Sequence, residues 1–445
     1  MKRLLTLLMC FVAIAAVAQE DTGELQKYRR SSLYTVLIKH SQLPYGTTID
    51  SAFMQMPLPD KFNDHNLALR SFESSAKRVK KGANNKKKDA VNEADIKSFI
   101  EANNIAKMMV AKWFNRNAET GICDMNLVSE RGNYDASQVD IALAEQSIRG
   151  RAMLADAGEE LIGNTFLLVN DITFRDKGEG SEKAAIGIAI LGGIAGAVLG
   201  SDLVSDAGSL LATGVNEIDG FQVNITSYLY RLVWNEELLW DFYTRFYTDE
   251  SYDDQQRIAN RDAFNAISGN DPLYQLEFVG KTTTHAGNLQ SKSFSKYSKL
   301  EQMTKVCTRA IDKAIVELQR EYDEFKVDVP IYEINDDGTV TVQIGLKEGI
   351  NKESRFDVLM PIEDEDGRIH YEKVGKIRPI EGQIWDNRFG ALEDAKALEE
   401  DPDAKVNEES KEGNAYLNAT TFNIISGGNR IMKGCLVREE TIKVQ

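Results

Sequence analysis

The spacing of apolar residues changes from a helical to a strand pattern near residue 327, and this change divides the chain. Upstream, residues 297–325 place apolar side chains three and four positions apart, which predicts one long amphipathic helix. Downstream, Val340, Val342 and Ile344 alternate with polar residues, as in a strand with one buried face. We therefore expect a long helix that leads into a separate C-terminal β domain.

The C-terminal region, residues 327–445, has the turns and short strands of a small β-barrel or sandwich. Asn335–Gly338 and Glu365–Gly367 are hairpin-turn signals between β-type runs. An acidic insertion at 391–413 interrupts the pattern, and we expect a loop or a short helix there. Further strands are expected at residues 356–361, 374–380, 422–425 and 431–437.

The preceding region, residues 131–326, predicts an α/β middle domain. Thr165–Phe174 is a short apolar run typical of a buried strand. Phe221–Trp234 is the longest strand pattern, and its apolar content spreads to both faces after a bulge expected near Ser227. Around these strands we expect helices at 135–158, 238–246 and 252–267 and a further strand at 274–279.

Residues 19–130 predict a helical N-terminal region. The apolar residues of 24–40 lie near one helical face, and those of 94–115 form the apolar side of a second helix. Between them, a lysine-rich patch at 77–88 is interpreted as a solvated loop, with an arm for acidic lipid or polysaccharide as the alternative.

The first eighteen residues have the pattern of a secretory signal peptide. Lys2 and Arg3 precede an apolar run that ends in a small-x-small site, so we expect cleavage between Ala18 and Gln19. Lipidation of Cys10 is the less favoured alternative. We therefore expect export to the periplasm or the outer membrane of a bacterial envelope.

Residues 184–200 contain no charged side chain, and Gly192, Gly196 and Gly200 recur every four positions. On a helix these glycines share one face and allow another helix to approach closely. The run is at the lower length limit for crossing a bilayer. The segment 184–214 is therefore a buried helix or helical hairpin, a membrane-inserted hairpin, or a flexible glycine-rich loop.

The charge and cysteine content exclude several classes of protein. The net charge of -16 repels phosphate backbones, so we expect no nucleic-acid partner. Cys123, Cys307 and Cys435 remain after signal cleavage, and three widely spaced cysteines make neither a disulfide framework nor a zinc site.

The sequence shows no recognisable catalytic pattern. The histidines are His40, His65, His285 and His370, and none stands in a tight metal-binding spacing. Nucleophile-elbow, P-loop and dinucleotide fingerprints are absent from the sequence. We expect no cofactor, no metal and no enzymatic activity. The enzymatic alternative is a hydrolase of envelope or extracellular polymers that uses a pair of Asp or Glu residues.

Five short segments of the C-terminal region carry a family resemblance. They are Val340–Gly345, Glu348–Ile350, Phe356–Val358, Gly375–Ile377 and Lys433–Val437. This region resembles the C-terminal domain of the flagellar assembly protein T type and similar tails of curli-secretion-like envelope proteins. It departs from them at Glu353-Ser354, where such domains have Gly-Asp, and in the acidic insertion. The resemblance implies a small barrel that serves as an assembly module and carries no catalytic residues.

Together these patterns predict an α+β protein: a helical N-terminal region, an α/β middle domain, a long helix and a small C-terminal barrel. We expect a non-enzymatic scaffold or accessory protein of envelope assembly or secretion, which contacts envelope proteins or itself. The main alternative is a subunit of a pore or secretion complex that contacts the membrane through 184–214.

Overall fold

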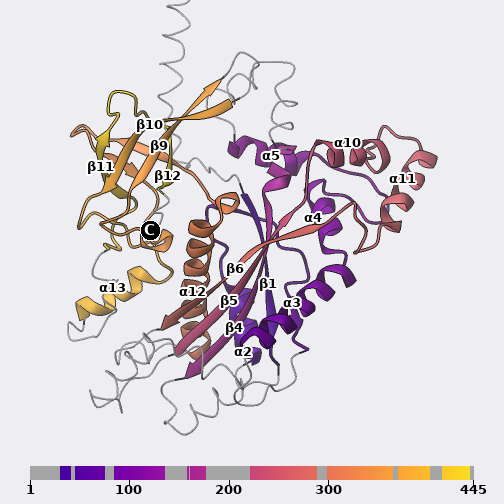
Figure 1. Ribbon diagram of the computed structural model, residues 1–445, viewed down its shortest axis with the longest axis horizontal. Coiled ribbons are helices and arrows are strands. Elements are labelled where there is room, and N and C mark those ends of the chain that lie inside the picture. The colour runs from indigo at the N-terminus through magenta and orange to yellow at the C-terminus, as the bar shows by residue number, and fades with distance from the viewer. Residues whose placement is uncertain are drawn as a thin grey trace, which may run out of the picture.

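The computed structural model describes residues 31–41, 46–75, 85–135, 158–159, 161–176, 221–287, 298–363, 369–400 and 413–440. Within these ranges the protein has an α+β fold: a mixed β-sheet with helices on both faces, and a closed β-barrel (Figure 1). Helix α12 (Lys299–Glu321) lies between the sheet and the barrel. The predicted α+β class and the small C-terminal barrel are therefore confirmed.

The sheet has the strand order β2-β1-β4-β5-β6, and β3 also pairs with β1. Strand β1 runs parallel to β2, β3 and β4, whereas β5 is antiparallel to both β4 and β6. The strands are β1 (Ser31–Lys39), β2 (Phe62–Asp64), β3 (Ser71–Glu73), β4 (Thr165–Asp176), β5 (Phe221–Leu232) and β6 (Leu276–Gly287).

Strand β1 corrects the helix expected over residues 24–40, of which 31–40 are described. Leu33 and Leu37 pack on one face of the sheet, and Tyr34 and Val36 pack on the other. A strand buried on both faces has a nearly continuous apolar run, so its residues also satisfy a helical spacing. The sheet therefore joins a strand of the expected helical N-terminal region to the strands of the middle region.

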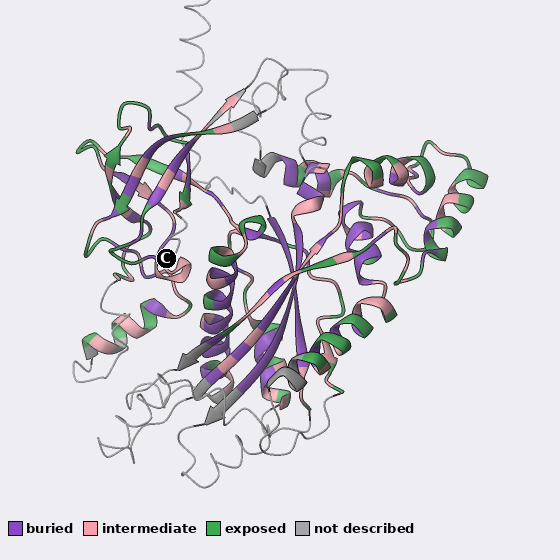
Figure 2. Cartoon of the chain, viewed as in Figure 1, coloured by how far each residue is buried: buried purple, intermediate pink, exposed green. Residues whose placement is uncertain are grey.

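Helices cover both faces of the sheet (Figures 1 and 2). One face packs against α12 and α2 (Gly46–Gln55), with Phe53 and Ile311 buried beside Leu168. The other face buries Trp113, Phe242 and further aromatic residues. Its helices are α3 (Asn85–Ala102), α4 (Ile105–Trp113), α5 (Asn126–Asp135), α10 (Glu236–Arg245) and α11 (Asp254–Ala266).

The single helix expected at 94–115 is in fact two helices, α3 and α4. Asn104 has a φ of 51°, in the left-handed region that ends a right-handed helix, and asparagine tolerates this conformation better than most residues. Residues 85–88 of the lysine-rich patch begin α3, so for them the interpretation as a loop is wrong.

The other patterns of the middle region agree with the structure at the level of element type. Strands β4, β5 and β6 and helices α10, α11 and α12 form where strands and helices are expected. The bulge expected near Ser227 instead lies between Leu229 and Tyr230, where the pairing of β5 with β6 shifts register. Ser227 itself pairs in regular register with Asn170 of β4.

The barrel closes in the order β10-β11-β8-β7-β12-β9, and every neighbouring pair is antiparallel. Its interior is filled by apolar residues such as Val342, Val358 and Phe422. The expected turn at Asn335–Gly338 connects β7 to β8. The strands of the barrel are β7 (Val329–Ile334), β8 (Val340–Val342), β9 (Phe356–Glu363), β10 (Ile369–Pro379), β11 (Thr420–Ser426) and β12 (Leu436–Glu439).

The described part of the acidic insertion forms a short helix, α13 (Ala391–Glu400). It follows the barrel segment 386–390, which crosses close to α12 (Figure 1). This segment, rather than a barrel strand, makes the polar contacts with the middle of α12.

Candidate functional site at the junction of sheet and barrel

Helix α12 is fixed at its start and is buried on two sides. Ser298 and Glu301 form a capping box that satisfies backbone N–H groups of the first turn. The apolar face, including Met303 and Leu318, packs on the sheet. Buried polar residues also occur along the helix: Gln302, Thr304, Lys305, Thr308 and Asp312. Lys305, Arg309 and Arg320 of α12 contact the C-terminal region, and we call this polar contact surface the junction.

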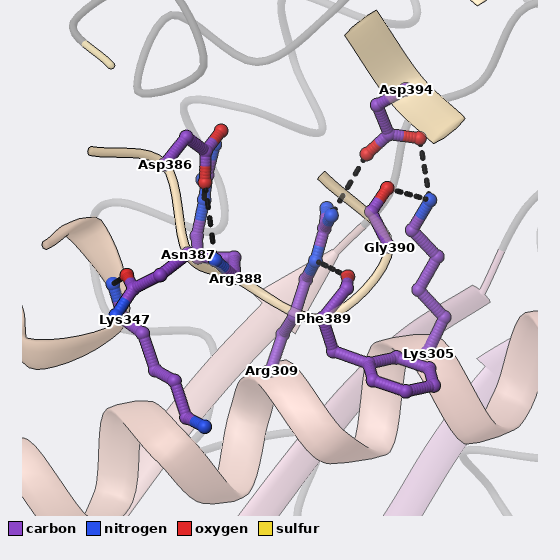
Figure 3. Close-up of polar contacts among 9 residues, drawn as sticks. All are labelled: Lys305, Arg309, Lys347, Asp386, Asn387, Arg388, Phe389, Gly390 and Asp394. Atoms are coloured by element: carbon purple, nitrogen blue, oxygen red, sulfur yellow. Dashed lines mark hydrogen bonds and ion pairs between the residues drawn. The ribbon is translucent and has the colours of Figure 1, made fainter. Parts of the chain in front are cut away.

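Asp394 of α13 is held by two cations of α12 (Figure 3). The Nζ of Lys305 binds one oxygen of Asp394 and also donates to the carbonyl of Gly390 at 3.1 Å. Arg309 donates from Nη2 to the other oxygen of Asp394 at 2.8 Å and from Nε to the carbonyl of Phe389 at 2.9 Å. These contacts fasten the start of α13 to the helix.

Lys305 is buried at its contact with Asp394 and Gly390. The side chain of Lys305 is 9% exposed, against 29% for Asp394. Desolvation lowers the pKa of Lys305, and the charge of Asp394 acts in the opposite direction. Gly390 has a φ of +71°, and a Cβ there would lie 2.7 Å from the Cε of Lys305. A side chain at position 390 would therefore collide with the lysine that fastens α13.

The segment 386–390 is also tied to the barrel. Within the segment, the side chain of Arg388 donates two hydrogen bonds to Asp386, each of 2.8 Å (Figure 3). Asn387 accepts from the backbone N–H of Lys347 at 2.8 Å and donates to Glu348 at 2.7 Å. The segment is therefore held by polar contacts on two sides: the barrel on one and α12 on the other.

A second contact joins the end of α12 to the barrel. Arg320 donates to both carboxylate oxygens of Glu439 on β12, at 2.9 and 3.2 Å. It also donates to the carbonyl of Gly349 at 3.0 Å. The two contact points, Lys305 with Arg309 and then Arg320, lie about three turns apart on one helix, so together they fix the barrel in direction as well as position.

Asp312 lies between these two contacts and is 7% exposed. Its Oδ2 atom has no hydrogen-bond partner among the described residues. Burial raises the pKa of Asp312 to about 7, an effect that Glu348 and Asp60 reinforce and that Lys347 and Lys61 oppose. Lys61 donates to Gln319 of α12 at 2.9 Å. The junction thus contains a carboxyl group that titrates near neutral pH.

A separate polar network lies at the end of β1. His40 Nε2 is 2.8 Å from Oδ1 of the buried Asp171, whose Oδ2 accepts from Asn92 at 2.8 Å. Asn92 also donates to the hydroxyl of Tyr228 at 3.2 Å. A histidine oriented by a carboxylate can act as an acid or base. Among the described residues, however, no hydroxyl or thiol nucleophile is hydrogen-bonded to His40.

The four histidines belong to different segments of the fold. His65 is buried beneath α4 and is hydrogen-bonded to Arg131 and to the carbonyl of Met109, each at 2.9 Å. Burial holds the pKa of His65 well below its usual value. His285 and His370 lie on β6 and β10. Within the described ranges no group of three or more metal-binding side chains occurs.

The three cysteines lie in three different cores. Cys123 belongs to one core of the sheet, Cys307 to the other and Cys435 to the barrel, and all are free thiols. Burial raises the pKa of Cys307 to about 12, so its reactive thiolate form is suppressed at neutral pH.

The residues singled out from the sequence as processing and packing sites lie outside the described residues. They are the cleavage pair Ala18 and Gln19 and the spaced glycines Gly192, Gly196 and Gly200. The same holds for the whole segment 184–214 and for nearly all of the helix expected at 135–158. These predictions remain predictions. In the part of the chain that is described, no helix has the length and apolar character needed to cross a membrane.

The junction residues are not recognisable from the sequence. Lys305 and Arg309 follow a helical spacing on the polar face of an amphipathic helix, where solvent contact is the ordinary expectation. Their partner Asp394 stands far along the chain in the acidic insertion, among many similar residues. The one available signal is the small residue Gly390 at the start of that insertion.

Helices α10 and α11 project away from the barrel and form the opposite end of the described structure (Figure 1). Phe242, Phe246 and Phe264 are buried at their base. On the outside, Trp240 of α10 is 70% exposed and Ile258 of α11 is 49% exposed.

Comparison of the sequence with protein families and with curated sequences finds no relative. No protein-family model matches the chain. No curated protein sequence matches it either.

Proposed function

We propose that this protein is a non-enzymatic, exported scaffold or accessory protein of the cell envelope that acts through contacts with other proteins. The observation that carries the proposal is the junction, where polar residues of α12 bind the barrel and hold it against the sheet and its helices. Lys305, Arg309 and Arg320 all have structural partners there. Such a fixed two-part body can hold partners at a set distance and orientation.

Two further features support this proposal. The signal-peptide pattern that ends at Ala18 favours export. The exposed Trp240 at the end far from the barrel is the kind of side chain that contributes strongly to protein contacts.

Fractionation of the native cells, combined with cross-linking, tests the proposal. We expect the mature protein in the periplasmic or outer-membrane fraction, cross-linked into larger species. A carbonate wash of the membranes separates peripheral association from insertion, and retention in the washed pellet would favour the pore-subunit alternative. A cytoplasmic protein, or an envelope protein that cross-links to nothing, would contradict the scaffold proposal.

A further inference from the structure

The outward face of the α10–α11 hairpin, which we call the hairpin face, exposes apolar side chains on a rigid base. Aromatic contacts fix the base: Phe242 stacks on Phe114 with 4.0 Å between ring centroids, and Phe264 packs edge to face against Phe246 at 5.8 Å. Asn235 and Asp253 cap the two helices by accepting backbone N–H bonds at 2.9 Å. Trp240 is therefore presented in a fixed position rather than on a loose loop.

The α10–α11 hairpin is acidic as a whole. Residues 236–266 contain eight Asp or Glu residues and three Arg residues. Each arginine already pairs with a carboxylate within the hairpin: Arg245 with Asp241, Arg257 with Asp254, and Arg261 with Asp262. Glu236 and Glu237, one turn before Trp240, are exposed and have no basic partner among the described residues.

An exposed tryptophan could contact a membrane, nucleic acid or another protein, and the charge of the hairpin distinguishes between these partners. Residues that anchor a helix on an anionic membrane combine aromatic side chains with Lys or Arg, whereas the charged residues next to Trp240 on α10 are Glu236, Glu237 and Asp241. The same carboxylates repel nucleic acid. A cationic protein surface with an apolar side chain at its centre fits both the charge and the indole.

We propose that the hairpin face is the docking site for a protein segment that carries an apolar anchor flanked by Lys or Arg side chains. The anchor packs on Trp240, and the basic side chains face Glu236 and Glu237. This inference rests on the proposed scaffold function and names the chemistry of its partner.

The test uses the full mature chain and two defined peptides of equal length, an amphipathic lysine–leucine helix and its glutamate–leucine counterpart. We expect the lysine–leucine peptide to bind, to shift the tryptophan fluorescence by a contribution that Trp240→Ala removes, and to lose affinity as salt is added. We expect the glutamate–leucine peptide and anionic phosphatidylglycerol vesicles to give no shift.

Variants locate the binding. Trp240→Ala should weaken peptide binding about tenfold or more, and Glu236→Gln with Glu237→Gln should weaken it about threefold. Tyr416→Ala is the matched control, because Tyr416 is a 57% exposed aromatic residue on the barrel side, and it should leave binding unchanged. Calorimetry measures the affinity of the variants that lack the fluorescent reporter.

The outcomes separate this inference from the proposed function. Equal binding of both peptides, binding of vesicles, or an unchanged affinity of Trp240→Ala would overturn the docking site. If the protein nevertheless cross-links into envelope species, the scaffold function stands without it. Loss of envelope localisation with intact peptide binding would instead overturn the scaffold function.

Discussion

Asp312 lies on α12, whereas Asp394 contacts α12 from α13, and the two carboxyl groups have different surroundings. Asp394 is partly exposed and forms ion pairs with both Lys305 and Arg309. Asp312 is buried, and its Oδ2 atom has no hydrogen-bond partner among the described residues, so burial disfavours its charged form. One carboxyl therefore supports the junction at neutral pH, and the other weakens it.

The junction should become less stable as the pH rises, because of Asp312. Its folded-state pKa of about 7 lies above the ordinary value of 3.8, so the folded state binds the proton more tightly. The contribution of Asp312 to the free energy of unfolding is greatest below about pH 4 and is lost as the pH rises to about 7, by at most about 4 kcal/mol.

We expect Asp312→Asn to stabilise the protein at pH 8 and to have little effect at pH 4.5. Urea unfolding at the two pH values measures the difference. Asp336→Asn removes an exposed carboxyl group of the barrel and serves as the control. An equal effect of Asp312→Asn at both pH values would show that its titration is not linked to folding.

Removing the charge of Asp394 should destabilise the protein clearly. Asp394→Asn leaves Lys305, whose side chain is 9% exposed, without its carboxylate, at a cost of roughly 1–3 kcal/mol. Glu101→Gln breaks an exposed pair with Lys97 and should cost no more than about 0.5 kcal/mol. Chemical denaturation measures the free energy of unfolding of both variants. Equal losses would mean that the Asp394 contact contributes no more to stability than an exposed ion pair.

At the level of elements, the sequence predicts best where one periodicity dominates. The helix at 297–325 and the barrel turn at Asn335–Gly338 have clear patterns, and both are present. Strand β1 could not be predicted, because burial on both faces removes the alternation that identifies a strand. The junction could not be predicted either, because the pairing of Lys305 with Asp394 depends on how distant elements pack.

Gly375 marks the place where β10 of the barrel has no room for a side chain. The pairing of β10 with β9 shifts register between Lys373 and Gly375, and a Cβ at position 375 would lie 2.5 Å from the carbonyl oxygen of Ser426. Gly375→Ala should therefore destabilise the barrel by about 2 kcal/mol. Gly428→Ala is the matched control, because its nearest neighbour would lie 3.7 Å away. Thermal unfolding measures the stability of both variants. If Gly375→Ala is as stable as Gly428→Ala, β11 can move aside to make room for the side chain.

In the whole molecule, α12 contacts both parts that have a hydrophobic core of their own, the sheet with its helices and the barrel. Its apolar face completes the core of the sheet, and its polar face carries the barrel. Interfaces within one chain that are polar and limited in area often allow domains to move or unfold separately. Here the contacts at Asp394 and Glu439 oppose such separation.

The two parts should unfold together in the natural protein and separately when the junction is broken. We expect one calorimetric transition for the mature chain and two for Lys305→Ala with Arg309→Ala and Arg320→Ala, because the barrel has its own core. Arg430→Ala, which removes an exposed pair with Glu372, should retain one transition. A single transition in the triple variant would mean that apolar contacts, rather than these cations, couple the two parts.

Strand β1 has a consequence for how the chain acquires this structure. Ser32 and Leu33 pair with Thr165 and Phe166, more than a hundred residues later, so an almost wholly buried strand is synthesised long before its main partner. Contacts of such long sequence separation form slowly. Until β4 arrives, the apolar run of β1 is open to wrong pairing and aggregation. The newly made chain therefore has a strong need for chaperone protection early in its synthesis, and its rate of correct folding depends on how soon β4 becomes free to pair.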